Sequence, residues 1–446
     1  MWPSPPAYTH RVTDSPIQRG RRRLTATVTD LEVRRQRALL VSLAFGSRTV
    51  EEAEASLDEL ALLTGTAGSE TVDRAMQQRA QPDPATYLGK GKTRELASLA
   101  KALDVDVVVV DGSLSPVQQR NLQQAFGCDV VDRTALILDI FAQHAHSKEG
   151  MAQVELALLR YRLPRLRGRG IELSRLGGGI GTRGPGETQL ETDRRRVVGR
   201  ISSLERQLKQ MQSGRATRRK ARRRSGLPTA ALVGYTNAGK SSLLNRLTDA
   251  AVLVEDRLFS TLDATTRRLE LPGGKTVLLS DTVGFVRDLP HELVEAFRST
   301  LEEAVETDLL LHVVDTSSER AEHQIAAVRA TLAEIGATRV PEMILLNKTD
   351  LAGEGSIGRL TGRHPEALAV SAVTGEGIPE LLVAIEDRLA AETVELELLI
   401  PYDRGEIISE VHRRGEVVGE AHEPGGTRIT ARIPAAEAGV FSDFGG

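Results

Sequence analysis

Residues 234–241 have the types and spacing to bind the phosphates of a nucleotide. They read Gly-Tyr-Thr-Asn-Ala-Gly-Lys-Ser, a complete P-loop pattern. An apolar run at 230–233 precedes the loop and a helical pattern follows it, so backbone N–H groups and a helix dipole converge on one point. Lys240 can reach the β- and γ-phosphates, and the Ser241 hydroxyl can ligate Mg²⁺. A Gly-rich turn without a ligand is the alternative that this loop alone leaves open.

Three later segments narrow the ligand to GTP. Residues 278–284 read as a strand that ends at Asp281, which can hold Mg²⁺ through a water, while the Gly284 N–H can contact the γ-phosphate. Residues 347–350 read Asn-Lys-Thr-Asp, and a carboxylate at Asp350 can accept from N1–H and the amino group of guanine, a donor pair that adenine lacks. Residues 369–372 read Ala-Val-Ser-Ala at the end of another strand, and their backbone N–H groups can bind guanine O6.

Two further segments carry a family resemblance. Together with the P-loop and residues 281–285, the segments 179–195 and Phe259-Ser260-Thr261-Leu262-Asp263 resemble the HflX family, ribosome-associated GTPases of the Obg–HflX group, and the similarity runs from about 35 to about 435. The resemblance implies GTP hydrolysis, binding to the rRNA of the large ribosomal subunit and dissociation of 70S ribosomes. It also implies that the Gly- and Arg-rich loop at 165–186 reaches toward the peptidyl-transferase region.

The predicted site combines these segments. The nucleotide-binding residues are Gly234, Tyr235, Thr236, Asn237, Ala238, Gly239, Lys240, Ser241, Phe259, Ser260, Thr261, Leu262, Asp263, Asp281, Thr282, Val283, Gly284, Asn347, Lys348, Thr349, Asp350, Ser371, Ala372 and Val373. The predicted catalytic residues are Lys240, Thr261 and Gly284. Mg²⁺ is assigned to Ser241, Thr261 and, through water, Asp281. The family pattern favours Thr261 as the threonine that senses Mg²⁺, whereas spacing alone leaves Thr265 and Thr266 open.

Two residues bear on the rate of hydrolysis. Phe285 follows Gly284 where Ras-like proteins carry a water-positioning Gln, so we expect slow intrinsic hydrolysis that needs outside stimulation, unless a polar residue elsewhere takes over. Asn237 resembles the P-loop asparagine of K⁺-stimulated GTPases. A K⁺ ion beside the α- and γ-phosphates could neutralise developing charge in place of an arginine finger.

Charge is segregated along the chain. Residues 160–224 hold 20 Lys/Arg and 5 Asp/Glu, whereas the remainder holds 38 and 56, for a net charge of −3. A basic segment with one aromatic residue favours the backbone of a structured RNA over stacking on single-stranded bases; a solvated helical face is the alternative. The candidate RNA-binding residues are Arg165, Arg167, Arg169, Arg175, Arg183, Arg194 and Arg195.

Composition limits the class of protein. A single cysteine, Cys128, excludes an internal disulfide framework and fits a reducing compartment. No apolar run is long enough for a membrane span, and the basic N-terminus lacks the apolar segment of a signal peptide. We therefore expect a cytoplasmic protein, with peripheral membrane association left open. We also expect a monomer.

The elements that must position the site divide into five parts. The sequence predicts a disordered basic tail at 1–34, an α/β domain at 35–145, a basic helical coiled-coil subdomain at 146–225, a P-loop domain at 226–390 with a doubly wound, mainly parallel sheet, and a small α+β domain at 391–446. In the second part, Val197, Ile201, Leu204, Leu208 and Met211 form the seam of a helix pair with 151–163.

Three functions fit these features. The first is a GTP-driven switch on the ribosome. The second is a GTPase that supports modification of a structured RNA, which calls for a catalytic cysteine or cofactor site that the sequence does not show. The third is a regulatory GTPase whose coiled coil engages a protein. ATP use by the N-terminal domain is left open.

Overall fold

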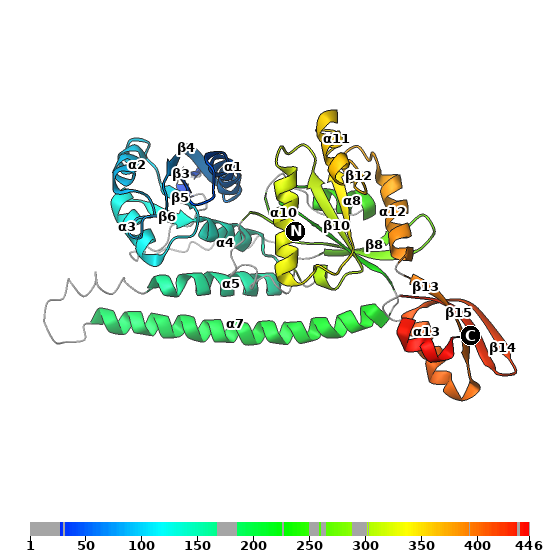
Figure 1. The fold of residues 1–446 in the computed structure, drawn as a ribbon. Coiled ribbons are helices and arrows are strands. Elements are labelled where there is room, and N and C mark those ends of the chain that lie inside the picture. Colours follow the sequence, from blue (N-terminus) through cyan, green and yellow to red (C-terminus); the bar gives the residue numbers. More distant parts are fainter. Residues whose placement is uncertain are drawn as a thin grey trace, which may run out of the picture.

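The computed structural model describes residues 27–29, 32–166, 185–224, 227–248, 258–259, 265–287, 301, 303–391, 393–434 and 438–445. Figure 1 shows an N-terminal α/β domain beside a larger α/β domain, two long helices that run below them, and a small C-terminal domain. The multidomain α/β fold expected from the sequence is confirmed.

The N-terminal domain is a parallel sheet with helices on both faces. Its strands have the order β4-β3-β5-β6, and a separate short hairpin of β1 and β2 precedes them. Alternate residues of β3 and β5 face opposite sides: Leu40 and Val109 pack with α1 and α4, whereas Leu39 and Val108 pack with α2 and α3. The elements are β1 Thr27–Thr29, β2 Glu32–Arg34, β3 Gln36–Ala44, α1 Val50–Thr66, β4 Ser69–Gln78, α2 Lys90–Ala102, β5 Val107–Asp111, α3 Pro116–Phe126, β6 Asp129–Asp132 and α4 Arg133–His144.

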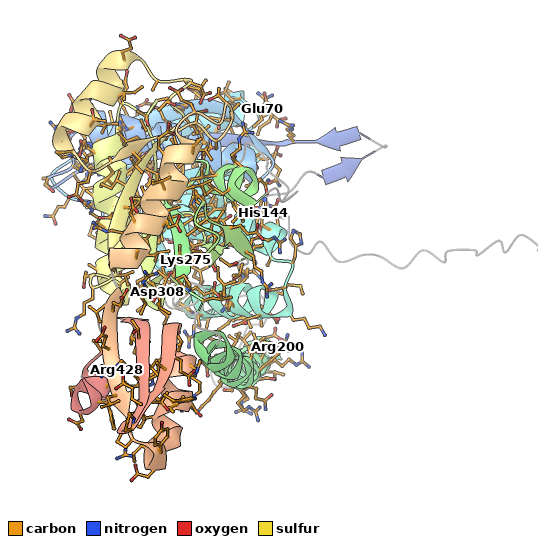
Figure 2. All side chains as sticks on the ribbon, turned by 90° about the vertical axis from the view of Figure 1, so that its right-hand side faces the viewer. Glu70, His144, Arg200, Lys275, Asp308 and Arg428 are labelled. Carbon is orange, nitrogen blue, oxygen red and sulfur yellow. The ribbon has the colours of Figure 1, made fainter. Side chains whose placement is uncertain are left out.

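The second part is a helix pair, as the sequence predicts. Helices α5 Lys148–Arg162 and α7 Pro185–Arg224 lie side by side, with the short 3-10 helix η1 Pro164–Leu166 after α5. Their shared apolar cluster includes Leu156, Leu204 and Ile201. Figure 2 looks nearly along α7, with Arg200 projecting from it. The long arginine-rich loop of the prediction lies mostly outside the described residues.

The larger domain has the sheet order β12-β11-β10-β7-β9-β8. All neighbours are parallel except β8 and β9, so the doubly wound, mainly parallel sheet is confirmed. Helices α8 and α12 cover one face and α10 the other. The elements are β7 Thr229–Gly234, α8 Lys240–Thr248, β8 Thr265–Glu270, β9 Thr276–Asp281, β10 Leu309–Asp315, α10 Ala321–Ile335, β11 Glu342–Asn347, α11 Glu354–Arg363, β12 Leu368–Ala369 and α12 Ile378–Ala391.

The C-terminal domain is a three-stranded antiparallel sheet packed on one helix. The strand order is β13-β15-β14, with η2 Tyr402–Arg404, α13 Gly405–Arg414 and η3 Gly439–Phe444 beside it. The strands are β13 Thr393–Ile400, β14 Glu416–Glu423 and β15 Gly426–Pro434. Residues 438–445 belong to this domain, because Phe441 is buried in its core and Gly445 pairs with Leu398.

No helix in the described ranges is both long and apolar enough to span a membrane.

Candidate nucleotide site

The P-loop joins the end of β7 to the start of α8, at the carboxyl edge of the parallel strands. Gly234 ends β7, Lys240 begins α8, and Asn237 and Gly239 adopt left-handed backbone conformations with φ of 60° and 93°. A Cβ at Gly234 would collide with the Val313 carbonyl oxygen, and one at Gly239 with the side-chain amide of Asn347. Both glycines are therefore required for the loop to fit between its neighbouring strands.

Lys240 lies at the centre of this loop. Its Nζ donates hydrogen bonds to the carbonyl oxygens of Gly234 and Tyr235, at 3.1 and 2.9 Å. Burial lowers the pKa of Lys240 to about 8, although the Asp281 carboxylate opposes the shift. A phosphate here would favour the ammonium form of this lysine.

Oxygen ligands for a Mg²⁺ ion come together beside the lysine. The Ser241 hydroxyl donates to Asp281 Oδ2 at 2.7 Å, and both side chains are buried. A hydroxyl and a carboxylate are oxygen donors of the kind that Mg²⁺ accepts, so these residues fit the predicted metal. Thr261 lies outside the described residues. Of the two alternatives, Thr265 begins β8 opposite Asp281, and the Thr266 hydroxyl is hydrogen-bonded to that of Ser280.

The segment after β9 is held against the P-loop. The Phe285 N–H donates to the Gly234 carbonyl at 3.1 Å, and the Thr236 N–H donates to the Phe285 carbonyl at 2.7 Å. This backbone pairing brings Gly284 next to Lys240, since an added Cβ would lie 3.1 Å from the lysine Nζ. The Phe285 ring itself packs in the core beneath α10, so it offers no polar group to a water at the site.

The residues predicted to read guanine form one connected cluster. Asn347 Nδ2 donates to the Ala238 carbonyl of the P-loop at 2.8 Å, and its Oδ1 accepts from the Ala372 N–H at 3.1 Å. The Ser371 hydroxyl donates to Asp350 Oδ1 at 2.6 Å, which orients the carboxylate. Lys348 is linked to Asp315 at 2.8 Å. Thr349 follows in the same loop, and its backbone N–H donates to the Val370 carbonyl.

One residue of this cluster has no motif to reveal it. Arg246, in the last turn of α8, donates through Nε to the Ala372 carbonyl and through Nη2 to the Val373 carbonyl, at 3.2 and 2.6 Å. These two hydrogen bonds hold the backbone of residues 372–373 against α8, the helix that follows the P-loop. Val373 itself is well exposed, so its predicted role rests on its backbone.

Two predicted nucleotide-binding residues direct their side chains elsewhere. The Phe259 ring packs edge-on against Phe141 of α4, with ring centroids 4.6 Å apart. The Tyr235 hydroxyl donates to Glu59 of α1 at 2.9 Å. Both side chains therefore contact the N-terminal domain, and only their backbones remain available to a nucleotide. Residues 260–263 lie outside the described parts of the chain. Thr282 and Val283, which directly precede Gly284, are buried.

The candidate RNA-binding arginines divide into three groups. Arg165 has partners within the protein: its guanidinium is bonded to Asp132, Gln119 and the carbonyls of Leu114 and Tyr161 and lies 3.5 Å from the Tyr161 ring centroid. Arg194 and Arg195 lie on α7. The candidates outside the described residues are Arg167, Arg169, Arg175 and Arg183.

Known proteins match the chain along most of its length. Family descriptions match successive parts: a GTP-binding GTPase N-terminal region at 54–142, a GTP-binding GTPase middle region at 144–222, a 50S ribosome-binding GTPase at 229–348 and an HflX C-terminal domain at 357–442. The GTPase HflX of Lacrimispora saccharolytica is 47% identical over 400 residues, which cover 90% of this chain and 94% of that protein. The GTPase HflX of Escherichia coli (strain K12) is 42% identical over 405 residues, with coverage of 90% and 94%.

A solved structure of a GTP-binding protein from Sulfolobus solfataricus in complex with GDP is 24% identical, with a TM-score of 0.41 and coverage of 79% of this chain and 98% of that one. The two bacterial relatives exceed two fifths identity over nearly the whole chain, and the matched descriptions follow one another in the order of the domains. This chain is a GTPase and belongs to the HflX family.

Proposed function

We propose that the protein is a GTP-dependent switch that binds the large ribosomal subunit and dissociates 70S ribosomes. The observation that carries the proposal is the basic helix α7, a 40-residue element with 13 Lys/Arg and 4 Asp/Glu that runs below both α/β domains in the view of Figure 1. Such a cationic rod suits the phosphates of a structured RNA surface. The match to a 50S ribosome-binding GTPase description at 229–348 supports the same partner. This function belongs in the cytoplasm.

The site supports GTP hydrolysis that is slow without the ribosome. Lys240 Nζ lies close to Gly284, and the ammonium group and the Gly284 backbone N–H would together stabilise charge on the γ-phosphate. Mg²⁺, held by Ser241 and by Asp281 through water, would neutralise phosphate charge. Because Phe285 is buried and apolar, a group that orients the attacking water must come from elsewhere, and we assign that contribution to the ribosome.

We further propose K⁺ as a second cation at the nucleotide. Asn237 is exposed in the P-loop with a left-handed backbone, where its side-chain oxygen can turn toward the phosphates. K⁺ would then add positive charge beside that of Lys240. GTP hydrolysis should be faster in KCl than in NaCl at equal ionic strength, and Asn237→Ala should remove the difference. Equal rates in both salts would contradict the proposal.

The ribosome proposal is tested by cosedimentation. The protein is mixed with 70S ribosomes or isolated subunits in the presence of GDP or a non-hydrolysable GTP analogue. We expect binding to the large subunit and loss of 70S particles with the analogue only. A variant with Gln at Arg194, Arg195 and Arg196 should bind more weakly, with a shallower salt dependence. A matched variant with Gln at Arg359, Arg363 and Arg388, on α11 and α12, should bind normally.

The alternative is a regulatory GTPase that acts on a protein or another structured RNA. Binding that depends little on salt and survives RNase would favour a protein partner, because few counterions would be released. Ribosome binding that is equal with GDP and with the GTP analogue would contradict the proposed switch.

A further inference from the structure

The Tyr235 side chain leaves the P-loop and contacts the N-terminal domain through helix α1. Its hydroxyl donates to Glu59 Oε2 at 2.9 Å and accepts from the backbone N–H of Arg287 at 2.7 Å. The phenol therefore joins three segments: the P-loop, the segment after Gly284 and helix α1. Burial and the nearby Glu59 raise the pKa of Tyr235 above its usual range, so the hydroxyl keeps the proton that it donates.

Glu59 is itself held firmly in place. Its other carboxylate oxygen accepts from Arg133 at 2.6 Å, and Arg133 is bonded to Asp111 at 3.2 Å. Asp111 ends β5 at the middle of the N-terminal sheet and is buried, where it also pairs with Arg48 and accepts from Ser56. A continuous chain of charged and polar groups thus connects the N-terminal sheet to Tyr235. A connected network of this kind restrains the groups that it joins.

Gly284 lies between two parts of the backbone that are held in place, one before it and one after it. Before it, Asp281 ends β9. After it, Phe285 is paired with the P-loop through its N–H and carbonyl, and Arg287 is held by the Tyr235 hydroxyl. The direction of the Gly284 N–H, which would face the γ-phosphate, depends on the backbone on both sides. Loss of the Arg287 bond would loosen the later side only.

We infer that Tyr235, oriented by Glu59 of the N-terminal domain, is a positioning residue for GTP hydrolysis that holds the backbone after Gly284 against the P-loop. The N-terminal domain thereby contributes to the site without touching the nucleotide. This inference extends the GTPase activity and does not depend on a ribosomal partner.

Loss of the Tyr235 hydroxyl should affect GTP and GDP differently. The β-phosphate is met by the P-loop backbone and Lys240, which Tyr235→Phe leaves unchanged. The γ-phosphate alone would meet Gly284. We therefore expect Tyr235→Phe to lower the maximal hydrolysis rate and the affinity for a non-hydrolysable GTP analogue by about fivefold, the scale of one lost hydrogen bond, while the GDP affinity changes less than about twofold.

The experiment measures kcat for GTP, and Kd for GDP and the analogue, on the full-length chain without ribosomes. Glu59→Gln should have the same selective effect, and the double variant should be little worse than either single variant, because both changes break one connected unit. Tyr402→Phe, whose hydroxyl bonds the Glu423 carbonyl in the C-terminal domain, and Glu395→Gln, beside Arg432, are matched controls that should leave all three constants unchanged.

Thermal unfolding of each variant checks that it folds. If Tyr235→Phe is too unstable to measure, Glu59→Gln carries the test alone, since it keeps the size of the side chain. Equal losses of GDP and analogue affinity would overturn the inference, because they indicate general damage to the P-loop. An unchanged or increased kcat would also overturn it.

Discussion

Lys240 makes nucleotide binding dependent on pH. Burial places the pKa of Lys240 at about 8, whereas a bound phosphate favours the ammonium form and raises that pKa. Between the two values, binding must therefore take up a proton, and affinity falls as pH rises. Below pH 8 the lysine is already charged and this dependence disappears.

We predict that the affinity for GDP is nearly constant from pH 6.5 to 7.5 and falls by up to about tenfold per unit above pH 8, as one coupled proton requires. The measurement is a titration of GDP binding by calorimetry in buffers of different ionisation enthalpy, which also counts protons taken up. Lys240→Met should bind GDP more weakly and should lose the part of the pH dependence that the lysine causes. Any pH dependence of affinity that remains belongs to the guanine base. A wild-type slope equal to that of Lys240→Met would contradict the assignment.

At the scale of elements, α5 is the connection between the basic helix and the rest of the molecule. Ala152 and Leu156 face α7, whereas Val154 and Ala157 pack with the core of the N-terminal domain. Two apolar faces on one helix explain why the sequence pattern predicts Ile201, Leu204 and Leu208 of the seam on α7 but not the second face of α5. Apolar residues repeating every 3.6 positions identify one buried face of a helix. The same pattern does not indicate whether the opposite face is also buried.

Leu204 is the fully buried residue of α7 in this small cluster. Leu204→Ala should weaken the docking of α7 on α5 by about 2 to 4 kcal/mol, because the other contacts at the cluster are few and the cavity cannot be filled. Hydrogen exchange of the α7 amides should accelerate at least tenfold, while exchange in the strands of the GTPase domain should be unchanged. Val198→Ala, an exposed position on the same helix, is the matched control and should have no effect. Faster exchange throughout the protein would show that α7 is not an independent unit.

At the scale of the whole molecule, local motifs were predictable and contacts between domains were not. The P-loop and the Asn347–Asp350 reader have fixed spacing because one loop must supply several groups to one ligand. Glu59 and Tyr235 are 176 residues apart, and neither belongs to a pattern that names the other. The role of Arg246 was not predictable either, because its partners are backbone carbonyls, which every residue carries.

The two domains also share an apolar boundary at the segments that flank the nucleotide site. Leu258, Phe259, Val283 and Val286 of the GTPase domain lie in one buried cluster with residues of α1, α4 and the N-terminal sheet. The Leu258 N–H also donates to the Thr66 hydroxyl. Leu258 and Phe259 directly precede the predicted nucleotide-binding residues 260–263, and Val283 and Val286 flank Gly284. Movement of either segment on hydrolysis would therefore disturb the boundary and alter how firmly the N-terminal domain is held.

Phe259→Ala should therefore uncouple the domains. Removing this buried ring costs about 3 to 5 kcal/mol, and the loss falls on the boundary because Phe141, its partner, belongs to the other domain. Scanning calorimetry should resolve the N-terminal and GTPase domains as separate transitions in the variant but not in the wild type. Phe441→Ala removes a ring of equal size from the C-terminal core and should lower only the transition of that domain. If both variants shift every transition equally, the boundary at Phe259 does not couple the domains.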